Sequence, residues 1–217
     1  PLLNAVQRLL DRLASGLRYD PRQTLSEYSA NISNILDFER LAAASIGLIG
    51  EAMEISHGAL ASVEQEPSEE PGEIDSSAFL IRLASGMGQA LPDGRLSAKN
   101  PVVEYLRQAR KPLLQYDIDL LPRFQSMAPA ERSWLDGLNM DVFVPVYAKD
   151  RWIGLLALGP KKSGDRYFPE DLALLQVLAD QTAVALENAR LYDHLKQRNA
   201  ENERLNQELR AANTELA

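Results

Sequence analysis

The chain has 217 residues, of which 45% are hydrophobic and 25% are charged, which is ordinary for a globular protein with one core and additional helix. Its formal net charge of −8 argues against a nucleic-acid partner, because phosphate binding depends on clustered basic side chains. The absence of cysteine excludes disulfides, thiolate catalysis, Cys-ligated zinc and thioether-attached chromophores.

Apolar runs in the sequence are short, and none reaches the roughly 18 residues that a membrane-spanning helix needs. No signal peptide is visible. The chain begins at Pro1 and stops inside a helical pattern, so we expect a fragment of a longer protein. We expect this fragment to be cytoplasmic and to meet a membrane only through segments that lie upstream of it.

Three helices are predicted before the first strand. Leucines at helical spacing predict an amphipathic helix over residues 2–18, which Asp20-Pro21 interrupts. Thr24 or Ser26 is the predicted cap of the second helix, and Asp37 is the predicted cap of the third. The apolar positions that these last two helices should bury are Leu25, Tyr28, Ile32, Ile35, Leu36, Leu41, Ile46, Ile49 and Met53.

The middle of the chain alternates short apolar runs with stretches rich in Gly, Pro and charge, which predicts short strands and helices joined by loops. Pro101 and Pro129 fit the first turns of two helices. In chain order we expect a strand at 59–63, a polar loop at 64–73, a strand at 78–84, a mobile loop at 86–99, a helix at 101–110, a short strand at 113–116 and a helix at 128–138.

The segment 142–158 has the pattern of a β-hairpin. Three valines at 142, 144 and 146 alternate with other residues, so they should share one face, with Phe143 and Tyr147 on the other. Pro145 cannot donate to a ladder and marks an edge or irregular strand, whereas Gly154 allows a neighbouring element to approach closely.

The last predicted helix opens at Pro169 and continues unbroken to residue 217, with Glu170 and Asp171 suited to its positive end. From Val184 onward its apolar residues follow a heptad repeat, which favours a coiled coil with a second copy of the chain. One row of this seam is Val184, Leu191, Arg198, Leu205 and Ala212, and the other is Asn188, Leu195, Asn202, Leu209 and Leu216. An asparagine at 202 should weaken the pair but fix its register.

No catalytic or metal-binding constellation is visible. The two histidines, His57 and His194, do not stand at ligand spacing, so a histidine metal site is not expected. Gly159 and Gly164 have the spacing of a phosphate loop, but Asp165-Arg166 stands where Lys-Ser/Thr should follow. We therefore expect no catalysis within this chain.

Four motifs of the C-terminal half together resemble a GAF domain of the kind found upstream of bacterial histidine kinase cores. They are the runs Val144-Pro145-Val146, Trp152 to Gly159, Phe168 to Leu175 and Ala179 to Tyr192. The resemblance implies an α+β fold, with a central antiparallel sheet, the N- and C-terminal helices packed together on one face and a small-molecule pocket on the other. It covers residues 24–192 and implies dimerisation through the terminal helices.

Departures from the family pattern narrow the range of ligands that this domain is expected to bind. Relatives that attach a bilin and relatives that reduce methionine sulfoxide need cysteines, so a covalent bilin is excluded. The motif of cyclic-nucleotide-binding relatives is incomplete at Pro160-Lys161 and Leu172-Ala173. No cofactor is identified. Loops and a short helix in the middle of the chain usually cover the pocket, which makes Tyr116, Arg123, Trp134 and Phe143 the candidate ligand-binding residues. An equally open alternative is that these aromatic residues are simply core.

The predicted organisation has three parts: a linker helix at 1–20, the GAF domain at 21–187 and a coiled-coil output helix at 188–217. The dimer should form through Leu191, Leu195, Asn202, Leu205 and Leu209. The predicted function is a non-catalytic sensory and dimerisation module of a histidine kinase in a bacterial two-component system. The open alternatives are a GAF module that regulates another output, such as a cyclase or transcription activator, and a ligand-free structural relay.

Overall fold

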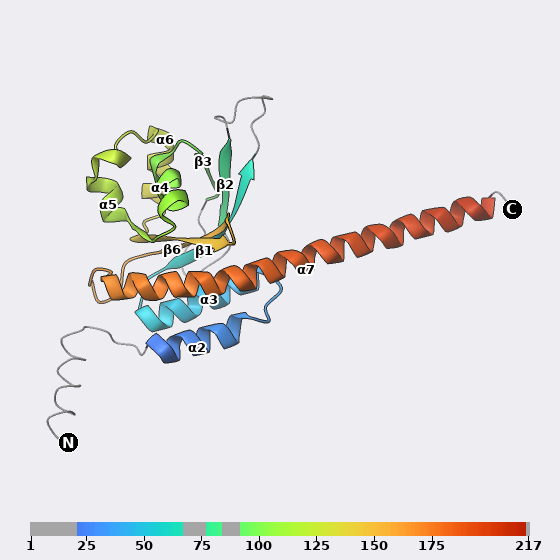
Figure 1. Ribbon diagram of the computed structural model, residues 1–217, viewed down its shortest axis with the longest axis horizontal. Coiled ribbons are helices and arrows are strands. Elements are labelled where there is room, and N and C mark those ends of the chain that lie inside the picture. The colour runs from blue at the N-terminus through green and yellow to red at the C-terminus, as the bar shows by residue number, and fades with distance from the viewer. Residues whose placement is uncertain (1–20, 67–76, 84–91, 216–217) are drawn as a thin grey trace, which may run out of the picture.

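The computed structural model describes residues 21–66, 77–83 and 92–215 and shows a single sheet covered by helices on both faces. Helices α4, α5 and α6 lie on one face, and α2, α3 and the first half of α7 lie on the other (Figure 1). The predicted α+β fold with its antiparallel sheet is confirmed. The predicted helix at 2–18 falls outside the described residues.

The sheet has six strands in the order β3-β2-β1-β6-β5-β4, and every neighbouring pair is antiparallel. The hairpin of β5 and β6 lies next to β1, which joins it to the β2–β3 half. The strands are β1 Gly58–Glu66, β2 Ala78–Leu83, β3 Gly94–Ser97, β4 Leu113–Leu114, β5 Val142–Ala148 and β6 Arg151–Leu158.

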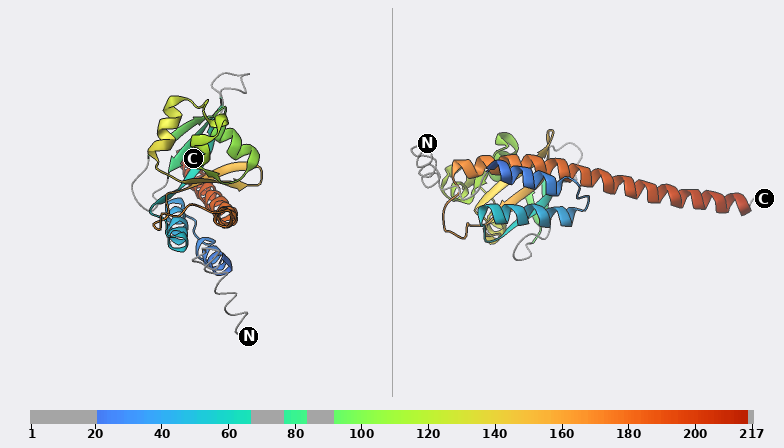
Figure 2. Two further views of the ribbon diagram at one scale, coloured as in Figure 1. Left: turned by 90° about the vertical axis from the view of Figure 1, so that its left-hand side faces the viewer. Right: turned by 90° about the horizontal axis from the view of Figure 1, so that it is seen from below.

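Six α-helices and one short 3₁₀ helix are described. The longest, α7, has 47 residues and extends far past the body of the domain (Figure 2). No helix in the described part of the chain has an apolar stretch that could cross a bilayer. The helices are α2 Pro21–Ile32, α3 Phe38–Met53, α4 Pro101–Ala109, α5 Gln115–Leu120, the 3₁₀ helix η2 Pro122–Phe124, α6 Pro129–Gly137 and α7 Pro169–Glu215.

The two faces of the sheet carry separate apolar cores. The predicted alternation in β5 is confirmed, because Val142, Val144 and Val146 pack toward α2, α3 and α7 whereas Phe143 packs toward α4 and η2. Pro145 lies beyond the two-residue pairing with β4, so the missing N–H of the proline faces no partner strand. The hairpin therefore separates the two cores and contributes side chains to both.

The structure corrects the predictions for the start of α2 and for Leu36, and it confirms the prediction for Asp37. Helix α2 already includes Pro21, the first residue that the structure describes, so the predicted cap at Thr24 or Ser26 was wrong. Leu36 lies in the α2–α3 connection and is exposed, so it is not on a buried helix face. Asp37 is the N-cap of α3, and its carboxylate accepts a 2.8 Å hydrogen bond from the Arg40 N–H.

Three predictions in the middle of the chain were wrong. Residues 64–66, predicted as loop, continue β1, because pairing with β2 satisfies their backbone despite their polar side chains. Residues 94–97, placed in a mobile loop, form the edge strand β3. Gln115 and Tyr116, predicted as strand, begin α5. In the first two cases the pairing with a neighbouring strand decides the conformation and local composition does not.

A buried ion pair fixes the start of α7. The Lys161 ammonium lies 2.6 Å from the Asp171 carboxylate, and both side chains are largely buried. The same carboxylate oxygen accepts a 2.8 Å hydrogen bond from the Phe168 N–H, just before the first turn. Asp171 thus satisfies an otherwise unpaired donor at the positive end of the helix, as its predicted position suggested.

A contact with Gly154 of β6 holds α7 at Leu186, a little more than one-third of the way along the helix. A Cβ at Gly154 would lie 3.1 Å from the Ala61 carbonyl oxygen, 3.1 Å from Leu186 Cδ2 of α7 and 3.3 Å from the Val146 Cβ. The predicted close approach is therefore confirmed, and one of the elements that approach is α7, through Leu186.

We expect Gly154→Ala to lower the free energy of unfolding by about 1–3 kcal/mol, because a methyl group must displace a backbone oxygen and a packed leucine. The matched control is Gly47→Ala in α3, where an added Cβ meets nothing within 4 Å. That control should stabilise the protein by up to about 1 kcal/mol. Urea denaturation followed by circular dichroism measures both, and equal effects would contradict the packing argument.

We expect Lys161→Met to destabilise the domain by about 3–5 kcal/mol, because it leaves the Asp171 carboxylate buried without its cation. The neighbouring Lys162 has an exposed side chain, so Lys162→Met should change stability by no more than about 0.5 kcal/mol. Thermal unfolding of the two variants compares them directly. A small loss in Lys161→Met would show that α7 does not need this anchor.

Candidate functional site

The four residues predicted to bind a ligand do not come together. Tyr116 is exposed on α5, where the Arg166 guanidinium lies 5.7 Å from its ring centroid. Arg123 in η2 lies over the rings of Tyr105 and Phe124, at 4.9 and 5.1 Å. These two side chains hold surface elements together and face no cavity that they share.

The other two candidates are structural. Trp134 in α6 donates a 3.1 Å hydrogen bond to the Pro92 carbonyl oxygen, and a Cβ at Gly94 would collide with its indole ring, so the ring lies flat on β3. Phe143 is fully buried under α4 and η2. The space between the sheet and α4–α6 is filled at this point by Phe124, Phe143 and their neighbours. The open alternative, that the aromatic residues are core, describes Phe143 correctly.

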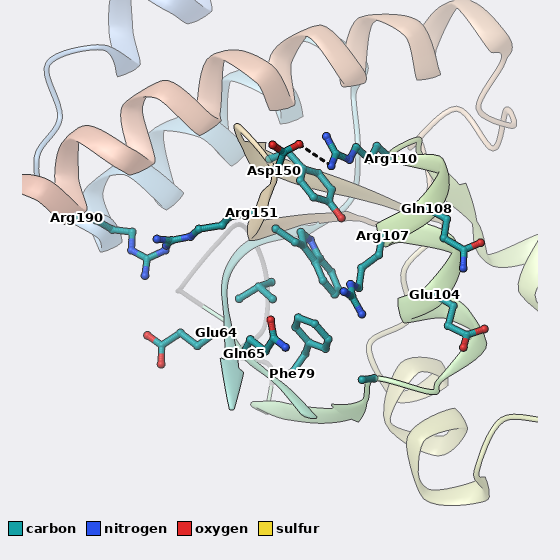
Figure 3. Close-up of a pocket in the computed structure, with 14 residues that line it drawn as sticks. Glu64, Gln65, Phe79, Glu104, Arg107, Gln108, Arg110, Asp150, Arg151 and Arg190 are labelled. Carbon is teal, nitrogen blue, oxygen red and sulfur yellow. Dashed lines mark hydrogen bonds and ion pairs between the residues drawn. The ribbon is translucent and has the colours of Figure 1, made fainter. Parts of the chain in front are cut away.

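A hollow of about 740 Å³ lies farther out, between α4, the turn of the β5–β6 hairpin and the exit of α7 (Figure 3). Its floor is largely aromatic and its rim is charged. The lining residues are Val63, Glu64 and Gln65 of β1, Phe79 of β2, Ala98, Glu104, Arg107, Gln108 and Arg110 on and beside α4, Tyr147, Asp150, Arg151 and Trp152 of the hairpin, and Arg190 of α7.

Aromatic contacts build the floor of the hollow. The rings of Phe79 and Trp152 lie 5.3 Å apart at an angle of 45°, and the Arg107 guanidinium lies 5.3 Å above the Phe79 centroid. Trp152 is only 7% exposed, and its indole Nε1 has no hydrogen-bond partner among the described residues. The indole nitrogen is itself buried, so Trp152 contributes to the hollow through its ring and not through this donor.

Tyr147 forms the wall beside α4. Its hydroxyl donates a 3.3 Å hydrogen bond to the Leu106 carbonyl oxygen. Burial raises the pKa of this hydroxyl above its ordinary value, and the positive charges of Arg110 and Arg107 oppose that rise in part. The phenol therefore stays protonated at neutral pH and acts as a donor.

The arginines of the hollow differ in whether a carboxylate neutralises them. Arg110 lies over the Tyr147 ring at 4.8 Å and forms a 3.0 Å ion pair with Asp150. Within the described part of the chain, Arg107, Arg151 and Arg190 have no ion-pair partner. Four arginines thus meet three carboxylates here, in a chain whose formal net charge is −8. The hollow is a local excess of positive charge that can attract an anion.

His57 has a structural place at the other end of the domain. Its Nε2 donates to the Asn139 carbonyl oxygen at 2.8 Å, which leaves Nδ1 to accept from the Ser56 hydroxyl at 2.8 Å. The ring also packs against Gly159, where a Cβ would collide with it. The imidazole therefore links three loops. Among the residues that the structure describes, no three His, Asp or Glu side chains are placed to hold a metal ion.

Sequence reasoning missed the hollow because its residues come from six segments that the topology brings together. One signal was available: Arg107 and Arg110 stand three residues apart, so they share a helix face. Arg151 lies within the predicted hairpin, and Arg190 lies on the predicted long helix. Neither position carries a local mark of a binding site.

Comparison with solved structures gives several that share this fold. A methyl-accepting chemotaxis protein, residues 122 to 287, matches with a TM-score of 0.55 and 16% identity, over 76% of this chain and 98% of that one. The free methionine-R-sulfoxide reductase of Neisseria meningitidis, solved with its substrate, matches at 0.53 and 16%, over 81% and 98%.

A third match is the GAF domain of a phosphoenolpyruvate-protein phosphotransferase from Coxiella burnetii, with a TM-score of 0.53, 13% identity and coverage of 80% and 96%. A comparison with curated protein sequences gives no match. The family model for the GAF domain matches residues 36–187, which is more than half of the chain. With the six-stranded antiparallel sheet and its two helical layers, this match shows that the chain belongs to the GAF domain family.

Proposed function

We propose that this GAF domain is a non-catalytic, cytoplasmic sensory and dimerisation module of a bacterial sensor histidine kinase, and that α7 is its output helix. The observation that carries the proposal is the continuity of α7. One unbroken helix runs from the core of the domain, where Leu178 and Leu186 are buried, to a segment whose apolar residues are exposed. A change in the domain therefore has a direct mechanical route outward.

The exposed apolar residues of α7 support pairing with a second copy. Val184 and Leu195 are each 60% exposed and Leu191 is 54% exposed, and all three stand on the predicted heptad. A single helix this polar would bury little surface and would fray in water. A parallel partner would bury each seam leucine for roughly 1.5–3 kcal/mol. Leu205 and Leu209 also lie on α7, but their side chains fall outside those that the structure describes.

The terminal helices of the domain lie side by side, which suits a relay. The Tyr28 hydroxyl of α2 and the Thr182 hydroxyl of α7 are 2.5 Å apart in the core. Thr182 also donates to the Leu178 carbonyl oxygen, so Tyr28 is the donor between the two helices. At the edge of the same contact, Ser29 donates to the Gln181 side chain at 3.2 Å. We accordingly retain residues 21–187 as the domain and 188–217 as the output segment.

The same module also suits another output. The similar structures include a chemotaxis protein and a phosphotransferase, so a GAF domain of this shape is compatible with several hosts. The motifs of the resemblance favour the kinase, and a cyclase or transcription activator is the second candidate. A structural relay without a ligand would need only α7 and its partner, and the charged hollow favours the sensory version.

We expect Leu195→Lys to weaken dimerisation of this chain by about 3 kcal/mol or more, which is over a hundredfold, because two seam leucines are lost and two charges are placed together. Gln197→Lys adds the same charge on the outer face of the heptad and should leave the dimer nearly unchanged. Sedimentation velocity over a dilution series measures both. A chain that stays monomeric at high concentration would overturn the dimeric model.

We expect Asn202→Leu to strengthen the dimer by about tenfold, because it replaces a buried amide on the seam with an apolar side chain. The gain should be accompanied by looser register, which paired cysteine cross-linking along the seam would reveal. An equal or weaker dimer would place Asn202 off the seam. Native mass spectrometry of the unmodified chain shows its oligomeric state and any retained ligand in one measurement.

A further inference from the structure

Two unpaired cations approach one another at the outer end of the hollow. Arg151 begins β6 at the turn of the hairpin, and Arg190 stands on α7. Figure 3 shows the two side chains pointing toward each other from these separate elements. Neither guanidinium has an ion-pair partner in the described ranges. Both side chains are exposed, so water screens part of their repulsion, and an anion between them would turn it into attraction.

We propose that this hollow binds a small, flat organic anion whose carboxylate or phosphate group is held between Arg151 and Arg190, so that the bound ligand ties the output helix to the β5–β6 hairpin. The sensory consequence rests on the function proposed above, whereas binding of the anion rests on the geometry of the hollow alone.

The size and chemistry of the hollow fit such a ligand. About 740 Å³ lies within the range of roughly 300–1,000 Å³ that small-molecule sites occupy. Guanidinium groups bind carboxylates and phosphates with paired, charge-assisted hydrogen bonds, which suits two arginines converging on one group. The opposite, inner part offers the edges of Phe79 and Trp152 as an apolar floor. A flat ring that carries an acidic group uses both ends.

The position of Arg190 links binding to output. Leu186, the residue seated against Gly154, stands four residues earlier, which is about one helical turn. Leu191, the first exposed leucine of the heptad, comes one residue later and is 54% exposed. The anion would therefore bind to α7 where the helix leaves the core, just before the exposed leucines of the predicted dimer seam. Binding there restrains the direction of the exit, and release lets the two arginines separate.

The test uses one of the two tryptophans as a probe. Trp152 lines the hollow and Trp134 does not, so Trp134→Phe leaves a single reporter in the site. This substitution removes the hydrogen bond to Pro92 and part of the ring that packs on Gly94, and circular dichroism checks that the fold is kept. The probes are phthalate, phenyl phosphate and inorganic phosphate, titrated at constant ionic strength. Isothermal titration calorimetry on the unmodified chain repeats the measurement without any substitution.

We expect phthalate or phenyl phosphate to cause a saturable change in Trp152 fluorescence, and inorganic phosphate to bind more weakly because it lacks the ring. Preference between the two aromatic probes tells whether a carboxylate or a phosphate is favoured. Arg190→Gln and Arg151→Gln should each weaken binding by about tenfold or more. Arg166→Gln removes the same charge outside the hollow and should change affinity less than twofold. Glu64→Gln removes a negative charge from the rim and should tighten binding.

Hydrogen exchange tests whether the bound anion restrains α7. The bound probe should slow exchange of the amides around residues 187–192, and this protection should vanish in Arg190→Gln at the same site occupancy. Absence of saturable binding by any probe, equal affinity in the arginine variants, or binding without protection of α7 would each overturn the inference. Sedimentation separates this from the proposed function: intact dimers that bind no anion refute only the ligand, and monomers that bind anion refute only the dimeric relay.

Discussion

The ion pair between Lys161 and Asp171 sets the position from which α7 is built, and the rest of the domain is arranged along that helix. Its two charges are largely removed from water, so each depends on the other and on the Phe168 amide. The second fixed point is the contact of Leu186 with the bare backbone of Gly154. About 22 Å of helix lies between them at 1.5 Å per residue. Along that stretch α7 is as much a part of the core as the sheet is.

This arrangement explains why the two faces of the sheet have different roles. The face toward α2, α3 and α7 is closed by apolar side chains and by the Tyr28–Thr182 hydrogen bond, which hold the terminal helices together. The opposite face is also packed, but its core stops short of the hairpin turn. There the sheet edge, α4 and the exit of α7 leave a charged hollow instead of a sealed interface. The proposed binding site and the exit of α7 thus lie together at the turn of a single hairpin.

Much of the fold could be predicted from the sequence, because it follows from local patterns. The valines of β5 alternate with period two, Asp37 stands at a helix start, and Pro101 and Pro169 fit first turns, so these elements were predicted correctly. Strand β3 and helix α5 were not, since Gly94 and Gln115 take their conformations from a neighbouring strand and a packed layer. Sequence periodicity carries no information of that kind.

The candidate site was harder to predict for the same reason. Aromatic residues near the middle of the chain were predicted to bind the ligand. In the structure Phe143 is buried in the core, and Trp134 connects α6 with β3. The hollow instead depends on Arg151 and Arg190, which are about forty residues apart and meet only through the hairpin and the seating of α7. The predicted seam follows from a local pattern, the heptad, and it stays a prediction; Leu191 and Leu195 are exposed on α7.

The part of α7 that continues past its contact with Gly154 acts as a lever arm. The arm held in the domain, from Asp171 to Leu186, is about 22 Å long, and the arm from Leu186 to Glu215 is about 43 Å long. A rigid helix that pivots at Leu186 moves its far end about twice as far as its anchored end. A tilt of one degree carries Glu215 through about 0.8 Å, which is comparable to the tolerance of side-chain packing. A sub-ångström rearrangement inside the domain therefore becomes a displacement that a packed partner must either follow or resist.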